Sequence, residues 1–424
     1  MSALLTLAAR SAWNRRFVLG LIVLSIALST FLLLGIERLR QDVRQNFAQA
    51  VSGTDLIVGP RTGSVQLLLY AVFRLGSATN NIAWDSVQAL AAQRQVAWTV
   101  PISLGDTHRG FAVVGTTGGY FEHFRFGERQ PLALAAGRVF GTGSAHVYEA
   151  VLGADVAERL GYALGRAIVL SHGGGAFAAN DHADKPFTVV GILARTGTPV
   201  DRSVHIPLAG MEAMHLDWVA GAPLPGAKVS ADEAARQDLT PRSVTAVLVG
   251  LKSRAAVFAV QRWVRGYADE PLMAVLPGVA LDELWEVVGA GERALQAVSV
   301  LVSVVSLAGL MAVILAGLNE RRRELAILRS VGAGPRQMLA LLAVEGALVT
   351  LCGVVLGALA CAGAVVALGE VVQARWGLTL RLAAPGPAEW QLLGALLLGG
   401  WLASLVPGYR AYRLSLVDGL SPRI

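Results

Sequence analysis

Long runs of apolar residues flank one large segment of mixed character in this chain of 424 residues. A helix needs roughly 20 mostly apolar residues to cross the hydrocarbon core of a bilayer, and four runs reach that length. These runs are residues 17–36, 294–318, 338–368 and 390–407. The first is longer than the apolar core of a typical signal peptide, and no small-residue cleavage site follows it, so we interpret it as an uncleaved anchor. The pattern predicts one transmembrane helix, a large insertion, and then three more transmembrane helices.

The large segment, residues 37–293, carries both strand and helix patterns. Aliphatic stretches bounded by glycine or polar residues predict strands, namely "TDLIVG", "FAVVGTT", "RAIVLSHG", "FTVVGILA" and "SVTAVLVGL". Amphipathic stretches predict helices at "WDSVQALAAQR", "ADVAERLGYAL" and "RAAVFAVQRWVRGYA". Residues 221–241 contain several Pro, Gly and charged residues and predict a loop or insertion. We therefore expect an extracytoplasmic α+β domain between the first and second transmembrane helices.

Both ends of this segment have apolar residues at helical spacing. The first end contains Leu39, Val43 and Phe47, and the second contains Leu281 and Leu284. Two interpretations fit this spacing: stalk helices that continue the neighbouring spans, or ordinary amphipathic helices on the surface of the domain.

The composition and the distribution of charge support a membrane protein and fix its orientation. Hydrophobic residues make up 54% of the chain and charged residues only 16%, with a mean hydropathy of +0.54. Residues 1–16, 319–337 and 408–424 together hold 11 basic and 3 acidic residues, whereas residues 37–293 hold 23 basic and 24 acidic ones. Because basic residues concentrate in cytoplasmic segments, we expect both termini and residues 319–337 in the cytoplasm, and the short loop 369–389 outside. The positive excess is thereby explained without a nucleic-acid partner.

The cytoplasmic loop "NERRRELAILRSVGAGPRQM" arranges its acidic, basic and aliphatic residues in a definite sequence. A loop that only kept its positive charge in the cytoplasm would not require this arrangement. Acidic residues stand near its start and arginines farther along, an arrangement that suits the helix dipole. Aliphatic residues between them predict an apolar patch for a partner, and Gly332 to Pro335 end the helix. A cytoplasmic anchor with no partner is the alternative.

With its order of one span, a large domain and three spans, this loop resembles that of MacB/FtsX-type (type VII) ABC transporter permease subunits, and the resemblance covers nearly the whole chain. It implies that an ATPase subunit contacts Glu320, Arg322, Glu324, Ile327, Leu328, Arg329, Gly332 and Ala333. The C-terminal "VPGYRAYRLSLVDGL" is similar to the end of the family's chains at Pro407 and Arg410, which imply a cytoplasmic contact, and departs from it at Gly408 and Leu416. "GTDLIVG" and "FTVVGIL" resemble the family's periplasmic core domain.

The resemblance implies a non-catalytic subunit of a bacterial inner-membrane transporter, in which ATP hydrolysis by a partner moves a periplasmic domain. ATP and magnesium would bind the partner ATPase, because none of the three lysines here stands in a Gly-Lys-Ser/Thr phosphate-binding loop. A second permease copy or homologue, a periplasmic adaptor or lipoprotein, and membrane lipid are the other implied partners. Alternative functions are lipoprotein release or a zinc-linked transport system. A membrane-anchored enzyme is disfavoured, since the sequence has no Gly-x-Ser-x-Gly nucleophile motif.

Two features of the third span stand out. Glu345 is an ionisable residue within an apolar run, where a charge is costly, so it has either an interhelical structural role or a transport role. Gly353, Gly357 and Cys361 recur every four residues and predict a face on which helices approach closely, within the chain or across a dimer.

A histidine-containing stretch of the outer domain, "SHGGGAFAANDHADKPF", is a candidate metal site. His172, Asp181, His182 and Asp184 supply imidazole and carboxylate ligands of the kind that bind zinc. Their spacing matches no zinc-finger pattern, and the alternative is a loop with chance polar residues. The two cysteines, Cys352 and Cys361, lie in an apolar run and build no disulfide framework outside the membrane.

Overall fold

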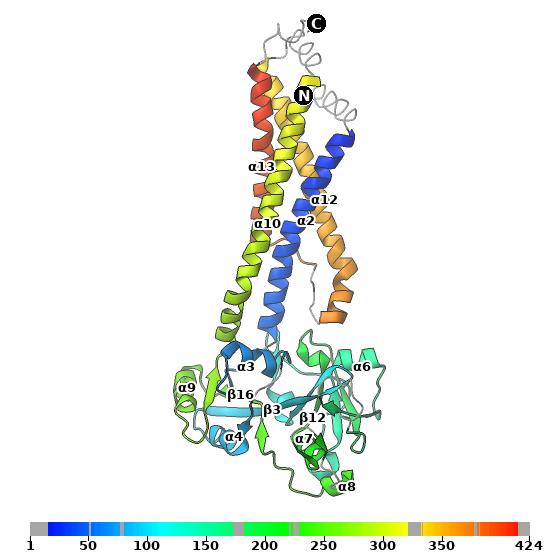
Figure 1. The fold of residues 1–424 in the computed structure, drawn as a ribbon, viewed down its shortest axis with the longest axis vertical. Coiled ribbons are helices and arrows are strands. Elements are labelled where there is room, and N and C mark those ends of the chain that lie inside the picture. Colours follow the sequence, from blue (N-terminus) through cyan, green and yellow to red (C-terminus); the bar gives the residue numbers. More distant parts are fainter. Residues whose placement is uncertain are drawn as a thin grey trace. The chain divides into compact units, whose positions relative to one another are not determined.

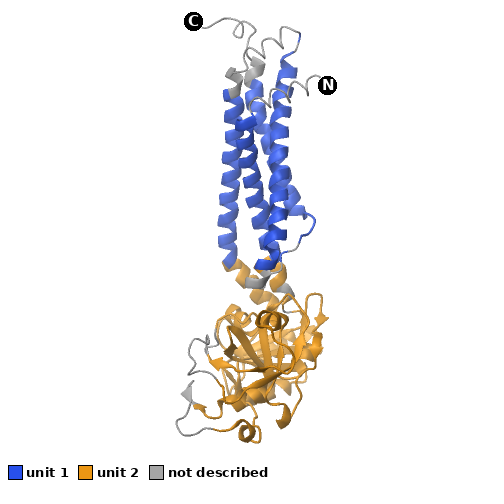
Figure 2. Cartoon of the chain, turned by 90° about the vertical axis from the view of Figure 1, so that its right-hand side faces the viewer, with its two compact units in different colours: residues 1–42, 288–371, 380–424 blue, residues 43–287, 372–379 orange. Residues whose placement is uncertain are grey.

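A computed structural model describes residues 16–50, 52–76, 80–172, 182–219, 222–223, 229–320, 332, 334–376, 380 and 382–413. The chain divides into two compact units, coloured separately in Figure 2. Unit 1 comprises residues 1–42, 288–371 and 380–424, and unit 2 comprises residues 43–287 and 372–379.

Four long helices account for the apolar runs (Figure 1). They are α2 (Arg16–Gln49), α10 (Pro277–Glu320), α12 (Pro335–Trp376) and α13 (Pro387–Arg413). Each contains an 18-residue window apolar enough to cross a membrane, with mean hydropathy between 1.6 and 2.7. The α+β domain lies in the sequence between the first and second of these helices. The predicted fold class, one span followed by an inserted domain and three further spans, is confirmed.

All four helices extend beyond the apolar runs. The two ends of the large segment, whose helical spacing left two interpretations open, belong to α2 and α10 themselves, and α12 continues past residue 368 to Trp376. The sequence places the end of the last span at Pro407, but α13 continues through this proline to Arg413. A proline removes only one hydrogen bond of the helix, a loss that transmembrane helices tolerate.

Unit 1 is held together by one hydrophobic cluster that all four long helices share. The glycine-containing face of α12 packs against α2 within this chain. A Cβ atom added to Gly353 would lie 2.7 Å from Cβ of Ile26, and one added to Gly357 would lie 2.4 Å from the carbonyl oxygen of Ala27. Cys361, on the same face, is 4% exposed within the cluster. The small residues therefore let the two helices approach more closely than any larger side chain would permit.

Polar contacts add to this apolar packing. The hydroxyl groups of Ser25 and Ser29 on α2 lie 2.9 and 2.8 Å from that of Ser306 on α10. Near the other end of α2, Arg38 Nε donates to Glu389 Oε1 at 2.9 Å, and Glu389 Oε2 accepts from the main chain of Gly386. These contacts join the first helix to the second and to the fourth.

Unit 2 is built on one mixed sheet of eleven strands. Along its main path the strands are β17 (Leu272–Val275), β1 (Leu56–Pro60), β16 (Ala246–Leu251), β3 (Val96–His108), β4 (Phe111–Thr116), β12 (Ser203–Pro207), β8 (Glu149–Leu152), β11 (Phe187–Leu193) and β7 (Leu134–Gly137). Two short strands lie off this path: β10 (Ser171–His172) pairs with β3, and β9 (Ala167–Ile168) pairs with β11. The β4–β12 and β8–β11 pairs are parallel and the others are antiparallel.

The central strands are apolar at consecutive positions because both faces of the sheet are covered. In β1, Ile57 joins one hydrophobic cluster, while its neighbours Leu56 and Val58 join another. In β4, Val114 belongs to the first cluster and Val113 to a third. Alternate residues of a strand point to opposite faces, so continuous aliphatic runs such as "LIV" indicate strands buried on both sides.

Short helices cover the two faces of the sheet. They are α3 (Ser64–Ala71), α4 (Trp84–Ala91), α5 (Gly119–His123), α6 (Ala154–Leu160), α7 (Leu208–His215), α8 (Ala231–Ala234) and α9 (Val257–Arg265), with 3₁₀ turns η1 (Ser144–His146), η3 (Pro199–Arg202) and η4 (Arg254–Ala256). Three two-stranded ribbons complete the unit: β13 (Trp218–Val219) with β14 (Ala222–Pro223), β2 (Ile82–Ala83) with β15 (Ser243–Val244), and β5 (Arg125–Phe126) with β6 (Gln130–Pro131). The expected loop 221–241 thus contains a strand and a helical turn, which Ser230 caps by accepting from the main chain of Glu233.

Candidate metal centre

An irregularity in strand β3 positions the first residue of a cluster of ligand-type side chains. The pairing of β3 with β4 shifts between Leu104 and Thr107, so one extra residue is accommodated as a bulge. Such bulges redirect side chains. Asp106 lies in this bulge, is 3% exposed, and pairs directly with His172 of β10. The Nδ1 atom of His172 lies 2.6 Å from Oδ1 of Asp106.

Two further histidines reach the same point from other segments. His215 is the last residue of α7, and its Nε2 atom lies 3.5 Å from Oδ2 of Asp106. His182 is fully buried, and its main-chain N–H donates to the carbonyl of Leu170, which fixes the chain beside β10. One ligand atom from each of Asp106, His172, His182 and His215 lies within 4.8 Å of all the others.

Several nitrogen atoms of this cluster are buried without a hydrogen-bond partner among the described residues. They are Nε2 of His172, both ring nitrogens of His182, and Nε2 of His215. Leaving one buried polar group unpaired costs about 1–3 kcal/mol. The arrangement is therefore unfavourable as a set of hydrogen bonds alone.

The protonation of the cluster follows from burial and from the single carboxylate. Burial and, after it, the neighbouring His215 lower the pKa of His182 to about 4, so this ring is neutral at physiological pH. Burial also raises the pKa of Asp106, but its close contacts with the rings of His172 and His215 outweigh burial and leave the pKa well below its ordinary value. For His215, burial lowers the pKa, while the contact with Asp106 raises it by more.

The side chains around the cluster shield it and hold its segments in place. The indole ring of Trp218 lies 4.8 Å from the ring of His172 and 4.5 Å from that of His182, measured between centroids. Next to Trp218, Asp217 accepts a hydrogen bond from the fully buried Lys185 at 2.6 Å. The end of α7 is thus joined to the segment that carries His182.

The structure brings together only part of the site expected from the sequence. His172 and His182 meet, as the candidate site requires. Asp184 does not join them; its carboxylate lies 3.4 Å from Nζ of Lys185 and is half exposed. Asp181 lies outside the described residues. Sequence reasoning missed Asp106 and His215. An anticipated β3–β10 pairing with the bulge would have signalled Asp106, whereas His215 reaches the site only because α7 ends there.

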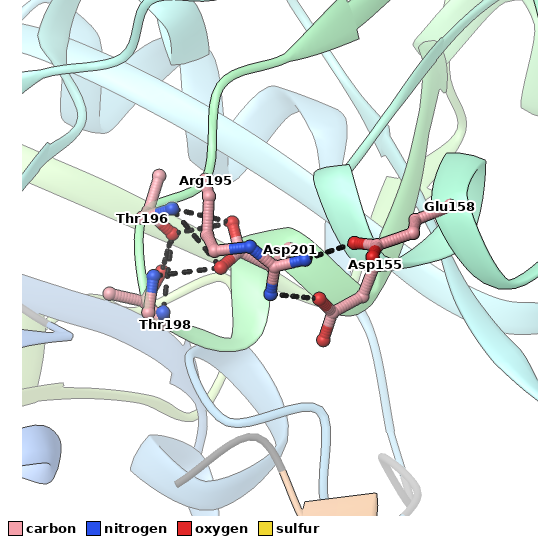
Figure 3. Close-up of polar contacts among 7 residues, drawn as sticks. Asp155, Glu158, Arg195, Thr196, Thr198 and Asp201 are labelled. Atoms are coloured by element: carbon pink, nitrogen blue, oxygen red, sulfur yellow. Dashed lines mark hydrogen bonds and ion pairs between the residues drawn. The ribbon is translucent and has the colours of Figure 1, made fainter. Parts of the chain in front are cut away.

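A second polar site lies in the loop after β11 and is structural (Figure 3). Asp201, which is 3% exposed, accepts hydrogen bonds from the main chain of Thr196 and Gly197 and from the hydroxyl of Thr196. Arg195 forms ion pairs with Asp155 and Glu158 of α6. These contacts fix the loop, part of which lines a cavity of about 310 Å³ together with Phe47 and Arg74.

The segment expected to contact an ATPase falls largely outside the described residues. Arg322, Glu324, Ile327, Leu328, Arg329 and Ala333 lie there, while Glu320 is the last residue of α10. Gly332 has a φ of +103°, a conformation that side chains disfavour, and α12 begins three residues later at Pro335. The helical segment that the sequence predicts before Gly332 lies outside the described residues.

The remaining expected residues lie in the membrane helices. Glu345 on α12 is 6% exposed. The next residue, Gly346, packs so closely against α13 that an added Cβ would lie 2.3 Å from Cβ of Ser404. Glu345 therefore stands beside a tight helix–helix contact. Pro407 and Arg410 lie in the last turns of α13.

Comparison with known families agrees with this architecture. The model for the MacB-like periplasmic core domain matches residues 19–267, and the model for the FtsX-like permease C-terminal domain matches residues 297–416. The chain belongs to the MacB/FtsX-type family of ABC transporter permeases. The first of these matches alone covers more than half of the chain, and together the two include all four long helices in whole or in part.

Two solved structures are similar to part of this permease. The periplasmic region of MacB from Actinobacillus actinomycetemcomitans shares 11% identity, covering 56% of this chain and 95% of its own, with a TM-score of 0.34. The extracellular domain of the noncanonic ABC-type transporter YknZ from Gram-positive bacteria shares 13% identity, covering 52% and 99%, with a TM-score of 0.30. No curated protein sequence matches the chain.

Proposed function

We propose that this permease converts ATP hydrolysis by a separate ATPase subunit into motion of its MacB-like domain. In this mechanism the cytoplasmic segment 319–337 binds the ATPase, and the long helices transmit the resulting movement. The cargo would be moved, extracted or handed over outside the membrane, and no solute would pass through an aqueous pore.

The continuity of α10 carries this proposal. This one helix begins at Pro277, where Ala280 and Leu281 are buried in the hydrophobic core of unit 2. It ends at Glu320, the first acidic residue of the proposed ATPase-binding segment. We infer that a force applied at Glu320 is passed along this helix to residues of the outer domain.

The tight packing of unit 1 supports the same mechanism. The Gly353–Ile26 and Gly357–Ala27 contacts and the serine cluster join α2 to α12 and α10. Since α2 and α12 lie in direct contact, they move together when α12 is displaced. We further propose that both termini are cytoplasmic, that the membrane is the bacterial inner membrane, and that two permease subunits pair with two ATPase subunits, which bind the ATP and magnesium.

Co-purification tests the proposal. The tagged full-length chain, expressed in its own host, is expected to retain an ABC ATPase through purification, identified by mass spectrometry and by ATP hydrolysis. Replacing both Arg322 and Glu324 with alanine is expected to release the ATPase. The matched control is Arg375→Ala, which removes an arginine from the opposite end of α12. Retention of an ATPase by the double variant at the wild-type level would contradict the proposal.

A further inference from the structure

Four segments of the chain bring metal-ligand side chains to one point of unit 2. Asp106 comes from the bulge of β3, His172 from β10, His182 from the loop before β11, and His215 from the end of α7. We propose that these four residues bind one divalent transition-metal ion, for which Zn²⁺ is the best chemical match. The site goes beyond the proposed coupling function and does not depend on it.

The pattern of hydrogen bonds within the cluster favours a metal over a purely polar network. Four imidazole nitrogens on three rings are buried without a partner among the described residues, yet only one carboxylate is present to accept from them. A metal ion accepts a lone pair from each ring and so satisfies one nitrogen of every histidine at once. The same buried groups would remain unpaired if the site served only to hold segments of the domain together.

The donor set selects the class of ion. Three imidazoles and one carboxylate suit zinc and similar borderline ions, whereas calcium and magnesium require mostly oxygen ligands. In a tetrahedral zinc site with bonds near 2.0–2.1 Å, neighbouring donor atoms lie about 3.4 Å apart. The His215–Asp106 distance of 3.5 Å fits this value. If both His172 and Asp106 bind the ion, their 2.6 Å contact must lengthen by about 1 Å. Alternatively, Asp106 keeps this contact and orients the His172 ring without binding the ion.

The surroundings resemble the outer shell of a metal site. The ring of His215 hydrogen-bonds the main chain of Met211, and because Nε2 has no hydrogen-bond partner, this bond uses Nδ1. Nε2 therefore points its lone pair at the cluster, with the ring orientation fixed from behind.

Access to the site is one-sided. His182 and Asp106 are closed off, with 0% and 3% exposure, but the side chains of His172 and His215 remain 22% and 29% exposed. An ion would enter past these two rings. Because it bridges four segments, it would also stabilise unit 2, by an amount that rises with the logarithm of its concentration above the Kd.

Metal titration of the full-length chain tests the proposal. The chain is purified in detergent without any ATPase, and its tag contains no histidine. After treatment with a chelator, the wild type is expected to bind one equivalent of Zn²⁺, to unfold at a higher temperature with zinc, and to show the intense visible absorption of tetrahedral Co²⁺. His172→Gln and His215→Gln change positions that are mostly buried but not closed off. Each is expected to weaken zinc binding by more than the roughly 10–100-fold that the loss of an outer-shell partner costs.

His123→Gln is the matched control, because His123 lies in unit 2 with its ring stacked on Trp98, away from the cluster. Equal zinc affinity in the wild type, His172→Gln and His215→Gln would overturn the proposal. If both variants fail to fold, the wild-type Co²⁺ spectrum decides alone: a tetrahedral spectrum supports the site and its absence overturns it. Neither result bears on co-purification with an ATPase, so the two proposals fail separately.

Discussion

The rings of Phe47 and Trp285 pack edge to face, with their centroids 5.5 Å apart. Phe47 stands near the end of α2 and Trp285 near the start of α10. Phe73 stacks on Phe47 at 4.3 Å, and the guanidinium of Arg44 lies 5.3 Å from the centre of the Trp285 ring. The parts of α2 and α10 that belong to unit 2 are thus joined to each other and to the core of that unit.

Phe47→Ala is expected to destabilise unit 2 by about 2 kcal/mol, below the range for a fully buried phenylalanine because Phe47 is only half buried. For a domain of this size the loss corresponds to a fall in Tm of roughly 4–8 °C. Near-UV circular dichroism of the full-length chain during heating measures it. Phe258→Ala, at a position 72% exposed on α9, is the matched control and should change Tm little. Equal Tm values for the two variants would show that the aromatic contact is unimportant.

Gly357→Ala is expected to loosen the contact between α12 and α2. The new methyl group would lie 2.4 Å from the Ala27 carbonyl oxygen, so the helices must separate. Gly363→Ala meets no atom within 4 Å and should be neutral or stabilise α12 by up to about 1 kcal/mol, because alanine is the better helix former. Heating in detergent followed by size-exclusion chromatography compares the two. The prediction fails if Gly357→Ala is as heat-resistant as Gly363→Ala.

The stability of unit 2 is expected to fall with acid partly through His205. Burial, and then the nearby Arg74, lower the pKa of this ring to about 3, whereas an unfolded histidine has a pKa near 6.5. As the pH falls from about 6.5 towards 3, the unfolded chain gains a proton that the folded chain excludes. Each pH unit in this window then costs up to about 1.4 kcal/mol. His205→Asn should flatten the pH dependence of Tm between pH 6.5 and 4.5, and identical slopes would contradict the assignment.

Asp201→Asn tests the loop shown in Figure 3. Its carboxylate accepts from Thr196 and Gly197 through both oxygens, and an amide retains only one acceptor oxygen. The expected loss is about 1–3 kcal/mol, because buried N–H groups become unpaired. Chemical denaturation of the full-length chain provides the measurement. Asp269→Asn, at an exposed position, should leave stability unchanged, and equal values for both variants would refute the role of Asp201.

Membrane architecture was predictable because it depends on properties that are local in sequence. Each of the four apolar runs meets a length requirement on its own, and strands such as "LIV" in β1 show their two-sided burial directly. The ends of the helices were less predictable. The residues beyond the apolar runs, such as Phe47 and Trp285, lie in segments with helical spacing, but this spacing did not reveal that they continue the spans as single helices.

The candidate metal centre was only half predictable for the same reason. His172 and His182 are close in sequence, so their association could be anticipated. Asp106 and His215 join them only through the β3–β10 pairing, the bulge in β3 and the position where α7 ends. In the membrane, the spacing of Gly353 and Gly357 predicted a close helix contact, but no local pattern identified α2 as the partner.

Hydrogen–deuterium exchange of the permease–ATPase complex in nanodiscs tests the central claim most directly, namely that ATP moves the outer domain through the long helices. Exchange is compared between the ATP-bound and nucleotide-free states. The account predicts that peptides covering residues 43–50 and 277–287 change their protection with nucleotide, and that the change disappears in Glu324→Ala. Unchanged protection throughout residues 43–287, in a complex that binds and hydrolyses ATP, would contradict it.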